Sequence, residues 1–236
     1  MMKNHFLPFY SSRQNGSALF MILIAVALFA ALSYALSQQR DGTKGLSTEK
    51  VRLLASDVID MGNGLADANA RLRLRRIADT AISFENSTVI GYINPNCTDD
   101  SCKIFAFDGG GRDWENPVTE INGGLAWGFT GNLAIQDIGS SNADFVGVVA
   151  DISEPICQRI NTLLGIYGTG GSPPVFAAVT ANKFIGTYSA APTTLTHAQI
   201  DRQKSACIQI TAAAGTAFSG PPAAESYVFY QVLEAR

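Results

Sequence analysis

Three hydrophobic patterns follow one another along the chain, and each predicts a different kind of structure. The first runs from Ser17 to Leu36 without a charged residue, a proline or a glycine. A helix of this length spans about 30 Å, which is the thickness of a bilayer core. We therefore expect a transmembrane helix over residues 17–36, preceded by a basic, acid-free leader over residues 1–16 that stays in the cytoplasm.

The second pattern is that of an amphipathic helix, which follows a polar break over residues 38–45. Ser47 fits an N-cap, and the apolar residues after it recur at steps of three and four. They are Val51, Leu54, Val58, Met61, Leu65, Ala68 and Leu72, then, after a phase slip, Leu74, Ile77, Ala81 and Phe84. This stripe predicts one helix over residues 47–84, bent at Gly62 and Gly64. It would pack either on the sheet of its own domain or as a coiled-coil stem between subunits.

The third pattern begins at about residue 86, where short apolar or β-branched runs alternate with turn residues. The expected strands are Thr88–Ile93, Lys103–Phe107, Leu125–Gly128, Leu133–Ile138, Phe145–Val149, Val175–Val179, Phe184–Tyr188, Ala206–Ile210 and Tyr227–Leu233. Two helices are expected between the strands. Ser153–Leu164 has Ser153 as an N-cap and Pro155 in the first turn, and Thr196–Lys204 begins with a capping-box spacing.

Together these patterns predict an α+β fold. A long N-terminal helix, made of a transmembrane part and an amphipathic stem, would pack on a mostly antiparallel β-sheet domain. The expected organisation is a basic leader over residues 1–16, a transmembrane helix over 17–36, a polar break and stem helix over 37–85, and an extracytoplasmic globular domain over 86–236.

Composition narrows the classes of function. The chain has 236 residues and a formal net charge of −3, and no long run of like charges. A general nucleic-acid binder would need a basic face, so we predict no nucleic-acid partner. Only 16% of the residues are charged, which suits a domain outside the cytoplasm.

The four cysteines also suit the cell envelope, where disulfides persist. Three pairings are open, and we favour Cys97–Cys102 and Cys157–Cys207 because neighbours pair most easily. The spacing does not match a zinc site, and His197 is the only histidine beyond the leader. We therefore expect disulfides and no metal.

The sequence offers little for catalysis. A Ser–His–Asp hydrolase would have to use His197, but no G-x-S-x-G motif is present, and His197 is better explained as a surface residue at a helix start. The segment Asp108–Asp113 contains three glycines but matches neither an EF-hand nor a phosphate-binding loop, and we interpret it as a hairpin turn. We expect no enzyme and no cofactor.

Other polar and aromatic residues have ordinary structural explanations as well. Asp99 and Asp100 are typical of a solvated loop tip, and Trp114 and Trp127 are equally consistent with core residues and with binding anchors. Four arginines late in the stem are better explained as a solvated helix face than as a patch that binds lipid headgroups or an acidic partner. They are Arg71, Arg73, Arg75 and Arg76.

The leader junction carries a family resemblance. Arg13-Gln14-Asn15-Gly16, followed by Ser17-Ala18-Leu19-Phe20-Met21-Ile22, resembles the leader junction of type IV pilins and pseudopilins. In that family a prepilin peptidase cuts after the glycine and methylates the new N-terminus. The resemblance implies a processing site at Gly16 and Ser17. The family usually has Glu at the fifth mature position, where this chain has Met21, so the resemblance is to minor members.

The resemblance implies a minor pilin or pseudopilin of a type IV pilus or a type II secretion filament. Its partners would be other subunits, through the N-terminal helix, the prepilin peptidase and the membrane. It would be a single-pass protein of the bacterial inner membrane, with its C-terminal domain in the periplasm or on an extracellular filament.

Two other outcomes remain open. Signal-peptidase cleavage after Ala35-Leu36-Ser37 would release an exported periplasmic or extracellular binding domain beginning at Gln38. An uncleaved chain would be a membrane-anchored envelope protein of unknown ligand.

Overall fold

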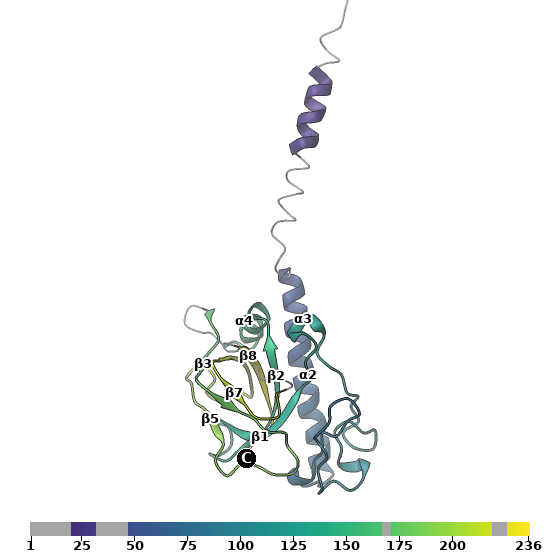
Figure 1. The fold of residues 1–236 in the computed structure, drawn as a ribbon, viewed down its shortest axis with the longest axis vertical. Helices are drawn as coiled ribbons and strands as arrows, with labels where there is room; N and C mark the ends of the chain where they lie inside the picture. Colours follow the sequence, from purple (N-terminus) through teal and green to yellow (C-terminus); the bar gives the residue numbers. More distant parts are fainter. Residues whose placement is uncertain (1–19, 32–46, 167–170, 219–225) are drawn as a thin grey trace, which may run out of the picture. The chain divides into compact units, whose positions relative to one another are not determined.

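The structure is a computed structural model that describes residues 20–31, 47–166, 171–218 and 226–236. The chain divides into two compact units, Met1–Ser47 and Thr48–Arg236. In the first unit, the described residues 20–31 form helix α1, drawn in purple in Figure 1. All of its residues are exposed, the large apolar ones included.

The prediction of a transmembrane helix over residues 17–36 is wrong. At about 1.5 Å per residue, the described residues 20–31 of α1 span about 18 Å, whereas a bilayer core is about 30 Å thick. Among the described residues, none of the helices has both the length and the apolar character needed to cross a membrane. The single-pass inner-membrane location that depended on this helix is therefore also wrong.

The predicted long N-terminal helix is wrong for the same reason, since the structure has α1 and a separate helix, α2. The second unit opens with α2, Thr48–Leu74. Its buried residues follow the predicted stripe, and they include Val51, Leu54, Val58, Leu65, Ala68 and Leu72. The stripe thus identified the buried face of α2 correctly, but it did not locate the end of the helix.

α2 stops at Leu74 because the apolar stripe leaves the buried face there. Leu72 is fully buried, whereas Leu74 is 85% exposed. Arg76 takes a left-handed conformation with φ 67°. Its N–H donates to the Arg73 carbonyl (2.9 Å), and the Ile77 N–H donates to the Leu72 carbonyl (3.1 Å). This is a Schellman motif, which closes the helix ten residues before the predicted end.

The centre of the second unit is a six-stranded sheet with the order β3-β6-β8-β2-β1-β5 (Figure 1). Its strands are β1 Gly128–Ile135, β2 Asp144–Ile152, β3 Val175–Phe176, β5 Thr193–Leu195, β6 Ser205–Ile210 and β8 Ser226–Glu234. The central pairs β6–β8, β8–β2 and β2–β1 are antiparallel, and the short edge strands β3 and β5 pair in parallel. β4 Val179–Thr180 and β7 Ala213–Ala214 form a separate two-stranded sheet.

Alternation along β8 separates the two faces of the six-stranded sheet. Val228, Tyr230 and Val232 belong to a core with Ile208, Val148 and other residues of the face away from α2. Phe229 and Gln231 point the other way and meet α2 at Gly62. A Cβ at Gly62 would lie 3.1 Å from Gln231 Oε1 and 3.2 Å from Phe229 Cε1. Glycine is therefore what allows α2 to pack so closely on the sheet.

Helix α4, Glu154–Leu163, covers the same face as α2 and confirms the helix predicted over Ser153–Leu164. Asn161 of α4 is buried and forms two hydrogen bonds with the backbone of Cys207 in β6. Its Nδ2 donates to the Cys207 carbonyl (2.7 Å), and the Cys207 N–H donates to its Oδ1 (2.8 Å). The side chain thus takes the place of a neighbouring strand at this point of β6.

Three of the predicted strands are confirmed and three segments form no strand. The confirmed strands are Phe145–Val149, which lies within β2, Ala206–Ile210, which lies within β6, and Tyr227–Leu233, which lies within β8. Three segments that were predicted as strands are irregular, namely Thr88–Ile93, Lys103–Phe107 and Phe184–Tyr188. The helix predicted over Thr196–Lys204 is also wrong, because this segment contains turns.

The other three predicted strands have different bounds in the structure. Val175–Val179 is divided between β3 and β4, and β1 covers parts of the predicted Leu125–Gly128 and Leu133–Ile138.

The irregular segments are held by side chains in place of a β-ladder. Asn94 Nδ2 donates to the carbonyls of Thr80 (2.9 Å) and Ile82 (2.8 Å), and the Lys183 ammonium donates to the Ile90 carbonyl (2.6 Å). Such bonds satisfy the backbone without a partner strand. The apolar residues that suggested strands are in part exposed here, with Ile90 at 85%.

Candidate functional site

A concavity in the second unit borders the outer side of α2. It has a volume of about 450 Å³, within the range of ligand-binding sites. We call it the α2 groove, and its lining residues are Asp57, Asp60, Met61, Arg112, Glu115, Asn116, Val118 and Ile121. One wall is therefore the N-terminal half of α2, and the other is the loop segment 112–121.

Helix α3, Thr119–Asn122, fixes the loop wall next to α2. The Lys50 ammonium of α2 and the Glu120 carboxylate of α3 form an ion pair of 3.0 Å. The hydrogen bond from Lys50 holds the pKa of Glu120 below its ordinary value. From the other end of α3, Asn122 Nδ2 donates to the Ala150 carbonyl of β2 (3.1 Å). The loop wall is thus attached both to α2 and to the sheet.

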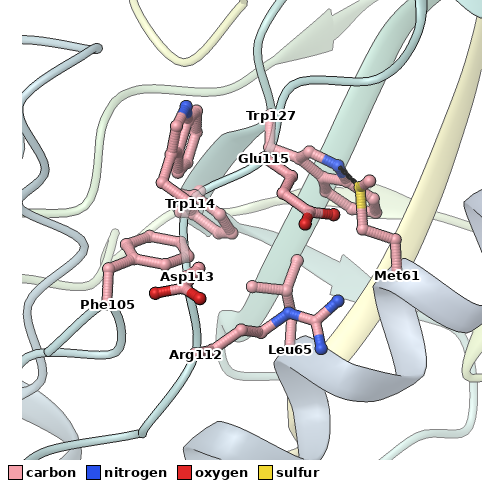
Figure 2. A pocket seen from close by; sticks show the side chains of 9 residues that line it. Met61, Leu65, Phe105, Arg112, Asp113, Trp114, Glu115 and Trp127 are labelled. Carbon is pink, nitrogen blue, oxygen red and sulfur yellow. Dashed lines mark hydrogen bonds between the residues drawn. The ribbon is translucent and has the colours of Figure 1, made fainter. Parts of the chain in front are cut away.

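A smaller aromatic cavity adjoins the groove and shares Met61, Arg112 and Glu115 with it (Figure 2). Its lining adds Leu65, Phe105, Asp113, Trp114, Trp127 and Phe129, and its volume is only about 10 Å³. That is about the smallest space that can hold one water molecule. The aromatic side chains thus fill this region. The apolar part of the groove itself, which we call its apolar base, consists of Met61, Val118 and Ile121.

The two tryptophans of this cavity use their indole nitrogens differently. Trp127 Nε1 points at the Met61 sulfur at 2.7 Å, as Figure 2 shows, and Trp127 is fully buried. Trp114 packs edge-on against Phe105, with ring centroids 4.9 Å apart. Its Nε1 is buried and has no hydrogen-bond partner among the described residues. Of the two possibilities left open for these residues, Trp127 is a core residue. Trp114 lines the aromatic cavity and has a buried N–H without a hydrogen-bond partner among the described residues.

Arg112 lies across the surface of α2 at Gly64. A Cβ at Gly64 would overlap the Arg112 guanidinium, so glycine provides the space in which this side chain lies. Figure 2 shows the guanidinium beside the helix, between the cavity and α2. Gly64 therefore makes room for a groove residue, Arg112, although the sequence pattern suggested only a bend at this position.

The rim of the two cavities is acidic. Asp57, Asp60, Asp113 and Glu115 are all exposed and accompany the single lining cation Arg112. In the described part of the chain these carboxylates form none of the ion pairs that the structure contains. An acidic rim over an apolar base fits a ligand surface that is cationic at its edge and apolar at its centre.

The disulfide prediction is confirmed. The Cys97 and Cys102 sulfurs are bonded within a surface loop, and the Cys157–Cys207 bond joins α4 to β6 in the buried core. The predicted processing site, Gly16 and Ser17, lies outside the described residues. Both disulfides lie away from the α2 groove, so they stabilise the domain and do not line the site.

The other residues singled out in the sequence occupy structural positions. His197 lies in a turn, where its Nδ1 accepts a hydrogen bond from the Gln199 N–H (3.3 Å). Asp99 caps a short 3-10 helix by accepting from the Ser101 N–H. Hydrogen bonds from the Ser101 hydroxyl and from the Ser101 N–H lower the pKa of Asp99. The segment Asp108–Asp113 contains turns, although no strands flank it as a hairpin would require.

Sequence reasoning missed the groove residues Asp57, Asp60 and Glu115. For Asp57 and Asp60 the sequence did contain a signal, because both acids lie outside the apolar stripe, on the exposed side of α2. Nothing in the sequence, however, indicated that segment 112–121 would lie against this part of α2. Comparison of the chain with known protein families, with curated proteins and with solved structures gave no match.

Proposed function

We propose that this protein is a minor pilin- or pseudopilin-like structural subunit of a filament of the type IV pilus or type II secretion kind. The observation that carries the proposal is the exposure of α1. Phe29 is 74% exposed, Met21 67% and Phe20 66%, and Val26 and Leu28 are similarly open. A helix with apolar residues on every side needs a surrounding apolar environment. In the proposed filament this environment is the α1 helices of neighbouring subunits.

The leader junction supports the same proposal. Gly16 follows a basic leader and directly precedes the apolar residues that begin at Ser17. Cleavage between these residues would place α1 close to the new N-terminus, where subunit helices pack in filaments of this kind.

The disulfides support a position outside the reducing cytoplasm. The structure pairs all four cysteines of the chain, one pair in a loop and one pair in the core. Disulfides of this structural type persist in oxidising compartments. A filament subunit whose second unit faces the exterior meets this condition.

The first experiment is to determine the N-terminus of the mature protein by intact mass and terminal sequencing. We expect a chain that begins at Ser17 and carries a methylated N-terminus. The Gly16→Ala variant should retain its leader, whereas Gln14→Ala, a matched change within the leader, should be cut normally. A mature chain that still begins at Met1, or normal cutting of Gly16→Ala, would overturn the proposal.

A second candidate function is favoured by the α2 groove. An exported binding domain would use the acidic rim and apolar base for a ligand with cationic and apolar groups. In that case the mature chain begins at Gln38 and lacks α1. The same terminal sequencing therefore separates the two functions.

A further inference from the structure

The C-terminal end of α2 has properties opposite to those of the groove. Leu74, the last residue of α2, is 85% exposed, and Phe107 on the neighbouring loop is 94% exposed. Arg75 joins the two segments, because its guanidinium donates to the carbonyls of Asp108 and of Gly109, the latter at 3.0 Å. We call this surface, with Arg71 and Arg76, the basic tip.

The tip carries positive charge that is available to a partner. Arg71 and Arg76 are exposed, and neither takes part in an ion pair within the described residues. Arg73 is different, because its Nε pairs with the Glu234 carboxylate at 3.0 Å. Arg71 and Arg76 therefore have no assigned structural partner, and they accompany two of the most exposed apolar side chains of the second unit.

Groove and tip are complementary in both charge and polarity. The groove has an apolar base under the carboxylates Asp57, Asp60 and Glu115, and the tip has apolar side chains among arginines. A groove of about 450 Å³ is large enough for one aromatic and one aliphatic side chain. Interfaces of this kind combine an apolar centre with a charged rim, and they favour aromatic residues and arginine.

Leu74 of the tip cannot reach Asp57 of the groove within one molecule. Asp57 and Leu74 lie on the same helix, separated by about 25 Å at about 1.5 Å per residue. A contact between them must therefore join two copies. Because the contact uses two different surfaces, it is head-to-tail, and repetition leads to a ring or an open filament and not to a closed dimer.

We infer that the α2 groove of one copy receives the basic tip of a second copy, with Phe107 and Leu74 over its apolar base and Arg71 and Arg76 against its carboxylates. The inference rests on the proposed filament function, to which it adds a contact between the second units. This contact is separate from the packing of α1. A filament in which α1 alone joined the subunits would leave both the groove and the tip unused.

The direct test places a photo-crosslinking residue, p-benzoylphenylalanine, at position 107 of the full chain in the cells that produce it. Two copies with different tags are made together, so that crosslinks between copies can be recognised. We expect a crosslinked dimer in which position 107 is joined to residues 57–61 or 112–121 of the other copy. The matched control has the same residue at position 90, where Ile90 is 85% exposed but belongs to neither surface.

Charge exchange tests the electrostatic part of the contact. Asp60→Lys with Glu115→Lys should reduce the crosslinked dimer about tenfold, because the new lysines would repel Arg71 and Arg76 of the other copy. Adding Arg71→Glu and Arg76→Glu to that protein should restore the dimer. All four side chains are exposed, so the exchanges leave the fold intact. Loss without restoration by the second exchange would overturn the pairing.

The outcomes distinguish the inference from the function on which it rests. If the chain begins at Ser17 and assembles, but position 107 crosslinks elsewhere on the copy or only to another protein, the head-to-tail contact is wrong and the filament proposal stands. If the chain begins at Gln38 and position 107 still crosslinks to the groove, the filament proposal is wrong and the contact stands.

Discussion

α2 has two sides that differ in what they contact, and Gly62 and Gly64 mark the difference. Gly62 faces Phe229 and Gln231 of the central strand β8, and Gly64 lies under the end of the flexible Arg112 side chain. On the inner side, the neighbours belong to a packed core that resists displacement. On the outer side, the neighbour is a surface side chain that can move. The same residue type therefore serves stability on one side and the shape of a groove on the other.

The difference extends beyond α2. The inner side includes α4, the buried Cys157–Cys207 bond and the Asn161 hydrogen bonds, all directed at the central strands. The outer side holds the exposed groove carboxylates and the surface Cys97–Cys102 loop. If this comparison is correct, substitutions on the inner side lower the free energy of unfolding far more than matched substitutions on the outer side.

The largest expected effect is the loss of the core disulfide. Replacing Cys157 and Cys207 by Ser should lower the free energy of unfolding by about 4 kcal/mol, because the bond closes a loop with a sequence separation of 50. Replacing Cys97 and Cys102, which are separated by 5, should cost about 2 kcal/mol on the same basis. Urea unfolding of the oxidised proteins measures both values. Equal losses would contradict the comparison.

Asn161→Ala should cause the next largest loss in the free energy of unfolding. The change removes both partners of the Cys207 backbone and leaves a buried N–H and a buried carbonyl unsatisfied. We expect a loss of about 3 kcal/mol in the free energy of unfolding. Asn132→Ala is a suitable control, because that side chain is only half-buried. A loss at Asn161 no larger than at Asn132 would show that water replaces the missing bonds.

Gly62→Leu should cost about 2 kcal/mol or more. The new side chain has to displace Phe229 and Gln231, which are held by the sheet, and overpacking of this kind typically costs about 1–3 kcal/mol. Thermal unfolding of the variant would show a lowered midpoint. An unchanged midpoint would mean that α2 can move away from β8, and the inner side would then be less rigid than the comparison requires.

The smallest expected effect is a gain in stability, whereas the other substitutions lower it. Gly64→Ala should raise the free energy of unfolding by about 0.5–1 kcal/mol, because alanine favours the helix and the Arg112 side chain can swing aside. Combining it with Arg112→Ala tests this reason, since the gain should persist without the guanidinium. Destabilisation by Gly64→Ala that disappears in the double variant would show that Arg112 is held firmly over the helix.

Local patterns located the parts of the molecule whose structure depends on near neighbours. The stripe from Val51 to Leu72 identified the buried side of α2, and Ser153 with Pro155 located the start of α4. The cores of β2, β6 and β8 were recognisable from their apolar runs. The candidate groove was not predictable, because its two walls come from segments 57–61 and 112–121, which no sequence pattern relates.

The sequence by itself thus determined the helical faces and the central strands, since each depends on periodicity along the chain. It favoured the cysteine pairing that the structure contains, but it left three pairings open. Only the tertiary structure decided where α2 ends, which apolar runs become strands and what lies against Gly64. A run such as Thr88–Ile93 becomes a strand only if a partner strand is beside it, and here Asn94 and Lys183 satisfy nearby backbone groups instead. Such decisions depend on contacts between distant residues, which the local pattern does not contain.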